Sequence, residues 1–146
     1  KAAELGGEKI ATYINRPERL PYTNNLCLAE TLTVLKRKWQ KDKVITWDGY
    51  QMRVYLLKSM VDGGRIQVSE FNFWERKFSD KALEISRKYE IDFLDAVQIV
   101  DIQEGPYNSF SGLSAPLLIT ADGGLSGAAR AEGVPVWYPI TEGFPD

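Results

Sequence analysis

The sequence predicts an α/β protein that is rich in helix, and two observations carry that prediction. Near the C-terminus, an apolar run at 117–120, a helix-forming stretch at 125–132 and a second apolar run at 134–138 follow one another closely. Strand, helix and strand at this spacing are typical of a right-handed βαβ unit with buried parallel strands. Before this unit, amphipathic helical stretches alternate with short segments of strand character.

In the first half of the chain, apolar spacing and turn residues define the elements. Leucines and a tryptophan recur at helical spacing between 28 and 39 and are expected to face the core. Asp48 is a suitable N-cap, and Gly63 and Gly64 are suitable helix stops. The predicted elements are a helix over 2–14 broken around Gly6 and Gly7, a strand over 22–26, a helix over 27–39, a helix over 49–61 and a strand over 65–68.

In the second half, Ser79 or Asp80 is expected to cap an amphipathic helix, and Asp92 begins the next. This next helix, IDFLDAVQIVDIQEG, is apolar on nearly every side and ends at Gly105, so we expect it to be central and well covered. A loop rich in Gly, Ser and Pro follows over 105–116. Gly133 is the expected stop of the 125–132 helix.

Composition restricts the possible chemistry. The chain has 146 residues, 44% of them hydrophobic, which suits one domain over 1–146 with a real core. With no histidine, Ser-His-Asp triads, Cys-His dyads and the common His-containing zinc sites are excluded, so acid–base or metal chemistry must use carboxylates. The net charge of −2 gives no overall signature of non-specific nucleic-acid binding. The single Cys27 excludes an internal disulfide and suits a cytoplasmic protein, and no apolar stretch reaches the ~20 residues of a membrane span.

Asp122 stands where the 117–120 strand ends, followed by Gly123 and Gly124. In open parallel sheets, ligands bind outside the carboxyl ends of the strands, so Asp122 is placed to hold a metal ion. Equally, Asp122 can cap the following helix while the glycines form a tight turn. A phosphate cradle is the weaker alternative, because DGGLSG matches neither phosphate-binding glycine motif.

Asp95 and Glu30 are the other candidate ligands. A carboxylate near the start of an apolar helix is costly unless it is paired, capped or metal-bound, and Asp95 with Asp92 also resembles a capping box. Glu30 lies at the flank of an apolar helix face with no cation three or four residues later, so it is either a ligand or a solvated side chain. Together, the three carboxylates suit a hard cation such as Mg²⁺, which can activate a water and stabilise a leaving oxygen in phosphodiester cleavage.

Three stretches in this order resemble the PIN domain family, including the VapC-type toxins of bacterial toxin–antitoxin pairs. The stretches are LAETLTVLKRKW at 28–39, LDAVQIVDIQEG at 94–105 and LLITADGGLSGAARAEGVPVW at 117–137, and the match covers roughly 20–138. The resemblance implies a three-layer α/β/α sandwich with a central, mainly parallel sheet. It also implies an endoribonuclease dependent on Mg²⁺ or Mn²⁺, with Glu30, Asp95 and Asp122 as catalytic metal ligands and Thr120 supporting the last acid.

The chain departs from the family at its beginning. The family's first acid ends an N-terminal strand, whereas this chain opens without Met and within what would be the first helix. We expect the natural protein to carry that strand and its Asp upstream. Without them, catalysis by this chain is in doubt.

The resemblance also implies partners. These are an RNA substrate, an antitoxin protein and a second copy of the chain, with no DNA or membrane partner. Lys36, Arg37 and Lys38, with Lys41 and Lys43, either guide RNA or form a solvated basic helix end that suits the helix dipole. The aromatic stretch FNFWERKF at 71–78 suits a core or an interface better than a base-stacking platform.

Two other functions remain open. A PIN-like module can bind RNA or protein without cutting, with the acids serving only as helix caps. A small nucleotide-binding module using the helix start at Gly123 and Gly124 is the less favoured alternative.

Overall fold

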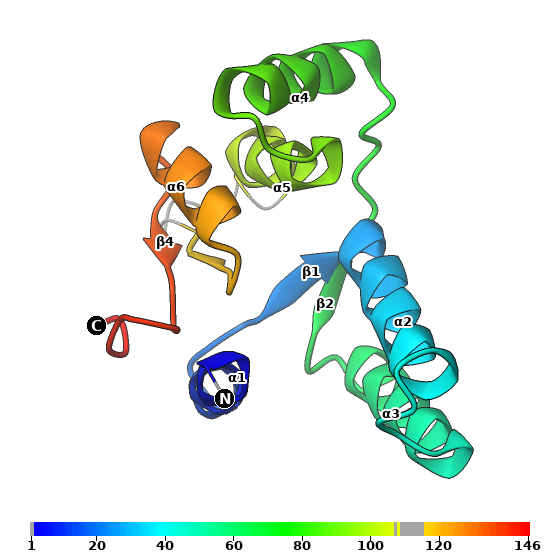
Figure 1. Cartoon of the computed structure of the whole chain (residues 1–146). Coiled ribbons are helices and arrows are strands. Elements are labelled where there is room, and N and C mark those ends of the chain that lie inside the picture. The colour runs from blue at the N-terminus through cyan, green and yellow to red at the C-terminus, as the bar shows by residue number, and fades with distance from the viewer. Residues whose placement is uncertain (1, 107, 109–115) are drawn as a thin grey trace. The chain divides into compact units, whose positions relative to one another are not determined.

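The computed structural model describes residues 2–106, 108 and 116–146 of the chain. These residues belong to two compact units (Figure 1). The smaller unit is Leu20–Glu70, and the larger unit combines Lys1–Arg19 with Phe71–Asp146.

The smaller unit is a parallel strand pair carrying two helices. It contains β1 (Tyr22–Asn24), α2 (Asn25–Gln40), α3 (Trp47–Asp62) and β2 (Gln67–Ser69). β1 and β2 pair in parallel from Tyr22↔Gln67 to Asn24↔Ser69. The strand-to-helix turn is sharp because Asn24, the last residue of β1, also caps α2, and its side-chain oxygen accepts a hydrogen bond from the Cys27 N–H at 3.0 Å.

The helices of the smaller unit differ from the sequence prediction in the N-cap of α3 and in the cover over α2. α3 is capped by Thr46, whose hydroxyl accepts from the Gly49 N–H at 3.1 Å, while Asp48 lies in the first turn. Gly63 is the C-cap, as predicted. Neither α2 nor α3 contains a buried residue, and Leu32 is 38% exposed, so the expected core face of α2 is only partly covered.

The core of the larger unit is formed mainly by helical residues, together with the buried side chain of Trp137. Its elements are α1 (Ala2–Ile14), α4 (Arg76–Tyr89), α5 (Phe93–Glu104), β3 (Leu118–Ile119), α6 (Gly123–Ala131) and β4 (Val136–Trp137). α4 packs on α5, and α5 is covered as predicted, with four buried residues. The buried side chains of these two helices are Ala82, Ile85, Ala96, Val97, Ile99 and Val100.

The predicted βαβ unit is present. β3 and β4 pair in parallel, with Leu118 opposite Val136 and Ile119 opposite Trp137, and α6 connects them. Gly133 adopts a φ of +79° just after α6, a conformation that favours glycine and ends the helix.

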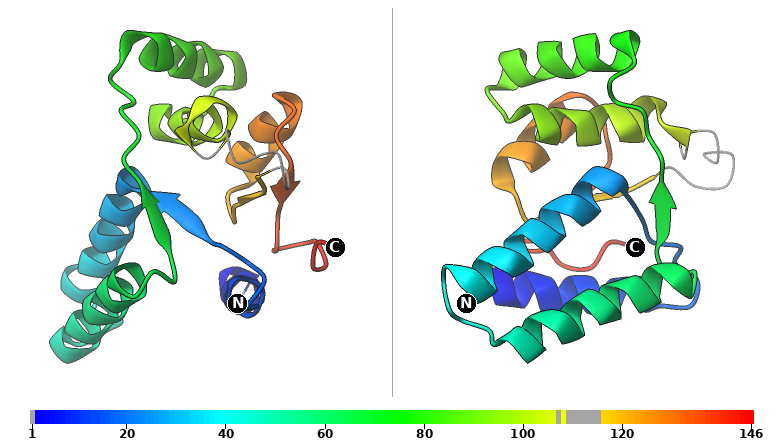
Figure 2. Two further views of the ribbon diagram at one scale, coloured as in Figure 1. Left: turned by 180° about the vertical axis from the view of Figure 1, so that it is seen from behind. Right: turned by 90° about the vertical axis from the view of Figure 1, so that its right-hand side faces the viewer.

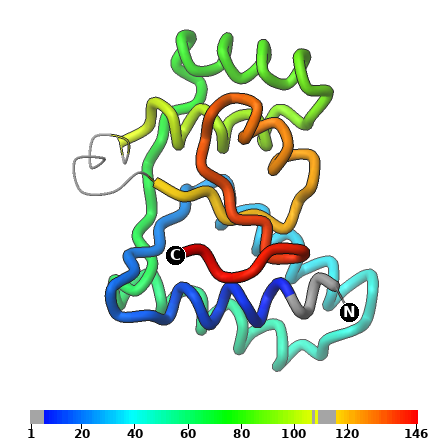
Figure 3. The backbone as a smooth tube through the Cα atoms, turned by 90° about the vertical axis from the view of Figure 1, so that its left-hand side faces the viewer, coloured from blue at the N-terminus to red at the C-terminus, as the bar shows by residue number. Residues whose placement is uncertain are grey.

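The C-terminal segment packs along α1, as Figure 3 shows. Lys9 Nζ donates hydrogen bonds to the carbonyls of Pro139 and Glu142, both at 2.9 Å. α1 is continuous, so the predicted break around Gly6 and Gly7 is wrong. A Cβ at Gly6 would lie 2.7 Å from Ile140 Cδ1, and the glycine therefore permits close approach of the C-terminal segment.

The expected three-layer sandwich with a central sheet is wrong. Among the described residues, the four strands have two or three residues each and form two separate two-stranded sheets. A sheet covered by helices on both faces requires several strands hydrogen-bonded side by side, and each of these pairs stops at two. The fold is mostly helical, with two small parallel β-pairs.

The predicted cap of α4 is also wrong, and part of the predicted 105–116 loop falls on residues outside the described ranges. α4 begins at Arg76 after Glu75, which makes no side-chain cap, so neither Ser79 nor Asp80 is the N-cap. Of the predicted 105–116 loop, 107 and 109–115 lie outside the described residues. Phe71 of the aromatic stretch is buried, whereas Trp74 is 72% exposed. Within the described ranges, no helix has both the length and the apolar character needed to cross a membrane.

Candidate functional site

Asp122 lies between the end of β3 and the start of α6, and the structure confirms its role as a helix cap. Its Oδ1 accepts a hydrogen bond from the Leu125 N–H at 2.8 Å. Its own N–H donates to Thr120 Oγ1 at 3.0 Å, so Thr120 shapes the turn that holds the acid. Asp122 is exposed, which leaves the carboxylate accessible from solvent.

The start of α6 lies against the residues that precede α5. A Cβ at Gly124 would lie 3.2 Å from Asp122 Oδ1 and 3.8 Å from Ile91 Cγ2. Asp92 follows Ile91 and caps α5, accepting from the Leu94 N–H at 2.8 Å. Asp95 lies in the first turn of α5 and is half-buried. The beginnings of two helices, each favouring negative charge, therefore bring acidic residues into one region of the larger unit.

Tyr138 is a site residue that sequence reasoning missed. A Cβ at Gly123 would lie 3.8 Å from the Tyr138 hydroxyl, which places that hydroxyl beside the start of α6. The available signal was position, because Tyr138 directly follows the second strand of the βαβ unit. The carboxyl ends of two parallel strands lie at the same edge, so a polar residue there belongs with Asp122.

Glu30 is exposed on α2 and belongs to the smaller unit. Neither unit by itself contains all three predicted ligands, because Asp95 and Asp122 belong to the larger one. Lys36, Arg37 and Lys38, predicted to contact RNA, are all exposed in the last turns of α2.

The chemistry of the donors suits a hard cation. In the part of the chain that the structure describes, no three His, Cys, Asp or Glu side chains are grouped closely enough to hold a metal ion. Mg²⁺, however, is commonly held by one or two carboxylates together with waters and substrate phosphates. Asp95 and Asp122 would hold such an ion in the larger unit, with Thr120 fixing the position of Asp122.

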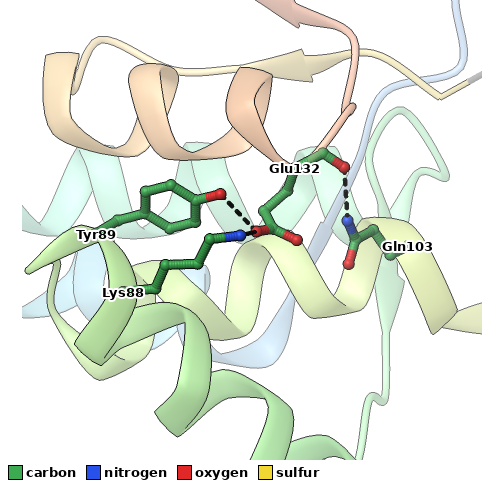
Figure 4. A network of polar contacts seen from close by, with 4 residues as sticks. All are labelled: Lys88, Tyr89, Gln103 and Glu132. Carbon is green, nitrogen blue, oxygen red and sulfur yellow. Dashed lines mark hydrogen bonds and ion pairs between the residues drawn. The ribbon is translucent and has the colours of Figure 1, made fainter.

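A second polar cluster, also missed at the sequence level, joins three helices of the larger unit (Figure 4). Glu132 Oε1, just after α6, accepts from Lys88 Nζ at 2.9 Å and from the Tyr89 hydroxyl at 2.6 Å. Gln103 Nε2 on α5 donates to the Glu132 carbonyl at 3.1 Å. The hydrogen bonds from Lys88 and then Tyr89 lower the pKa of Glu132, and Glu132 raises the pKa of Lys88. The cluster fixes α6 to α4 and α5.

Glu142 provides a further anchor for the C-terminal segment. Its Oε2 accepts from the Tyr138 N–H at 2.9 Å, and its Oε1 pairs with Arg130. The backbone hydrogen bond and then the Arg130 contact lower the pKa of Glu142. This contact holds the segment that carries Tyr138 close to α6.

No protein-family model matches the chain, and no curated protein or solved structure shows significant similarity to it.

Proposed function

We propose that the chain is a metal-dependent endoribonuclease of the PIN type that cleaves RNA phosphodiester bonds. The observation that supports this most strongly is the position of Asp122. It follows a parallel strand in a βαβ unit, and its helix begins against the start of α5, where Asp95 lies. Acids at the carboxyl ends of parallel strands occupy the position where open α/β structures bind ligands.

In this proposal, Asp95 and Asp122 of the larger unit hold Mg²⁺ or Mn²⁺, and Glu30 stays a ligand expected from the motif order alone. When bound, such an ion would activate a water molecule and stabilise the charge that develops on the phosphate. Thr120 acts as a positioning residue through its hydrogen bond with the Asp122 N–H. Tyr138, beside the start of α6, is placed to donate a hydrogen bond to a substrate oxygen.

We extend the proposal to the toxin of a toxin–antitoxin pair that forms a homodimer in the cytoplasm. Its support is the resemblance of the three motifs, together with exposed apolar side chains on α3. Met52, Tyr55 and Leu56 are 69%, 62% and 59% exposed, which is the kind of surface that a protein partner or a second copy covers.

The test is cleavage of a 5′-labelled RNA by the purified full-length protein in Mg²⁺, in Mn²⁺ and in EDTA. We expect cleavage only with the divalent ions, and its loss in Asp95→Asn and in Asp122→Asn. Asp80→Asn is the matched control, because Asp80 is an exposed acid of the same unit that pairs with Arg76. Cleavage that survives both site substitutions would contradict the assignment.

A non-catalytic RNA- or protein-binding module is the second candidate. It is favoured by the hydrogen bonds of Asp92 and Asp122, each of which already serves as a helix cap. RNA binding that is equally strong in EDTA and in Mg²⁺, with no cleavage under any condition, would select this function.

A further inference from the structure

We propose that the tip of the α2–α3 helical hairpin binds single-stranded RNA through cations placed around an exposed aromatic cluster. The choice of RNA rests on the proposed nuclease function, whereas the surface itself is defined by the smaller unit alone. We call this surface the basic–aromatic tip. It comprises Lys36, Arg37, Lys38, Lys41 and Lys43 with Trp39, Trp47 and Tyr50 (Figure 2 shows the hairpin and its connecting loop).

The positive charge of the tip is local. Five cations fall within 36–43, while only Asp42 and Asp48 oppose them nearby, in a chain whose net charge is −2. All five cationic residues are exposed. Arg37 pairs with Asp42 at 3.6 Å, and across the described ranges no ion pair engages the four lysines. These lysines are therefore available to phosphates.

Aromatic rings lie between the cations. Trp39 on α2 packs against Trp47 and Tyr50 on α3, with ring centroids 4.7 and 5.3 Å away, and Trp47 lies 5.5 Å from Tyr50. Trp47 is nonetheless 50% exposed. Because its neighbours hold it in place, the exposed part of this ring is a preformed surface on which an unstacked base can pack.

The helix dipole does not account for this arrangement. Cations are favoured in the last turn of a helix, where only Arg37 and Lys38 lie. Lys36 precedes that turn and lies one turn before Trp39, so the two share a face. Lys41 and Lys43 lie in the loop beyond it, and Lys43 adopts a φ of 54°, which a non-glycine residue seldom does.

The combination favours a single strand over a duplex. In a duplex the bases are stacked on one another, so the Trp47 ring finds no free base to pack against. Only the phosphates are accessible, and these interact with the lysines. A single strand can offer both a base to Trp47 and phosphates to the lysines. Surfaces of this kind bind without strong sequence preference and with marked salt dependence.

The first test measures binding of a fluorescent oligouridylate 20-mer by anisotropy in EDTA, so that no cleavage occurs. The charge variant replaces Lys36, Lys38, Lys41 and Lys43 by Gln. The control replaces four exposed cations elsewhere by Gln, namely Lys58, Arg76, Lys77 and Arg87. A plot of log K against log salt has a negative slope, and we expect only the charge variant to make it less steep. Each lost phosphate contact reduces the magnitude of the slope by about 0.7 for single strands, so the loss of four contacts reduces it by up to about 3.

The second test addresses the aromatic ring. Trp47→Leu is expected to weaken binding roughly 5- to 150-fold, the range for one base–aromatic stack. Trp74→Leu removes a more exposed tryptophan, 72% against 50%, from the larger unit and is expected to leave binding unchanged. Thermal melting of each variant shows that it is folded.

The outcomes separate this surface from the nuclease proposal. Equal binding by the charge variant and its control, or preferential binding of duplex RNA or of anionic phospholipid vesicles, would overturn the basic–aromatic tip even if the chain cleaves RNA. Conversely, salt-dependent binding through the tip in a chain that cleaves nothing would support the surface and refute the nuclease.

Discussion

The substitution Glu132→Gln tests whether the polar cluster holds α6 in place. It keeps the size of the side chain but removes the negative charge that accepts hydrogen bonds from Lys88 and Tyr89. The Glu132 side chain is 18% exposed and the Lys88 side chain is 58% exposed, so solvent weakens the lysine contact and most of the loss comes from Tyr89. Exchanging a charged acceptor for a neutral one costs about 1 kcal/mol.

For a chain of 146 residues, a loss of about 1 kcal/mol lowers the midpoint of thermal unfolding by about 3 °C. The assay is thermal unfolding followed by circular dichroism at pH 7, with Glu84→Gln as the control. Glu84 is exposed on the neighbouring helix α4, and we expect its replacement to change the midpoint by less than about 1.5 °C, because a neutral surface substitution changes stability by less than about 0.5 kcal/mol.

The difference between wild type and Glu132→Gln also depends on pH. The cluster lowers the pKa of Glu132 in the folded chain from its ordinary value of 4.5, so the carboxylate stabilises the fold fully above that value. The stabilisation is lost as the pH falls below about 4.5 through the lower folded pKa, because protonated Glu132 then resembles Gln. A difference that is absent at pH 7, or that grows on acidification, would refute the reasoning.

Two further predictions follow from local contacts. Asp122→Ala removes the cap of α6 and is expected to cost about 1 kcal/mol, whereas Asp122→Asn retains a capping oxygen and should melt within about 1 °C of wild type; equal losses in the two variants would contradict the cap assignment. Ile99→Ala, at a fully buried position of α5, should cost roughly 2–5 kcal/mol in urea unfolding, and Leu83→Ala, at a 58% exposed position of α4, should cost far less.

The sequence predicts those elements that depend on local patterns. The C-terminal βαβ unit follows from two apolar runs of strand length with a short helix between them. The burial of α5 follows from the apolar residues on nearly every side of this helix. The start of α5 follows from Asp92, which is a suitable N-cap. Each of these patterns spans fewer than about 25 residues and has one dominant physical solution.

Features that depend on distant residues were not predictable in the same way. Gly6 suggested a helix break, but it faces Ile140, more than 130 residues away. Thr46 and Asp48 are both suitable caps, and only the backbone conformation selects Thr46. The extent of a sheet depends on which strands pair, and among the described residues each strand pairs with one other.

Some features of the candidate site follow from local patterns, and others depend on distant residues. The sequence order places Asp122 at the end of a strand and Asp95 at the start of a helix, and both positions are confirmed. Tyr138 was missed although it directly follows β4, because its approach to Gly123 depends on how the chain folds. The role of Glu30 as a ligand stays a prediction. It rests on the order of the motifs, and Glu30 itself belongs to the smaller unit.

Binding of Mn²⁺ by the chain, followed through the electron paramagnetic resonance signal of the free ion, tests the central claim most directly. The account predicts saturable binding that Mg²⁺ competes away, that Asp95→Asn and Asp122→Asn each abolish, and that Asp80→Asn retains. Binding that is absent in the wild type, or unchanged in both site variants, would contradict a metal site at Asp95 and Asp122.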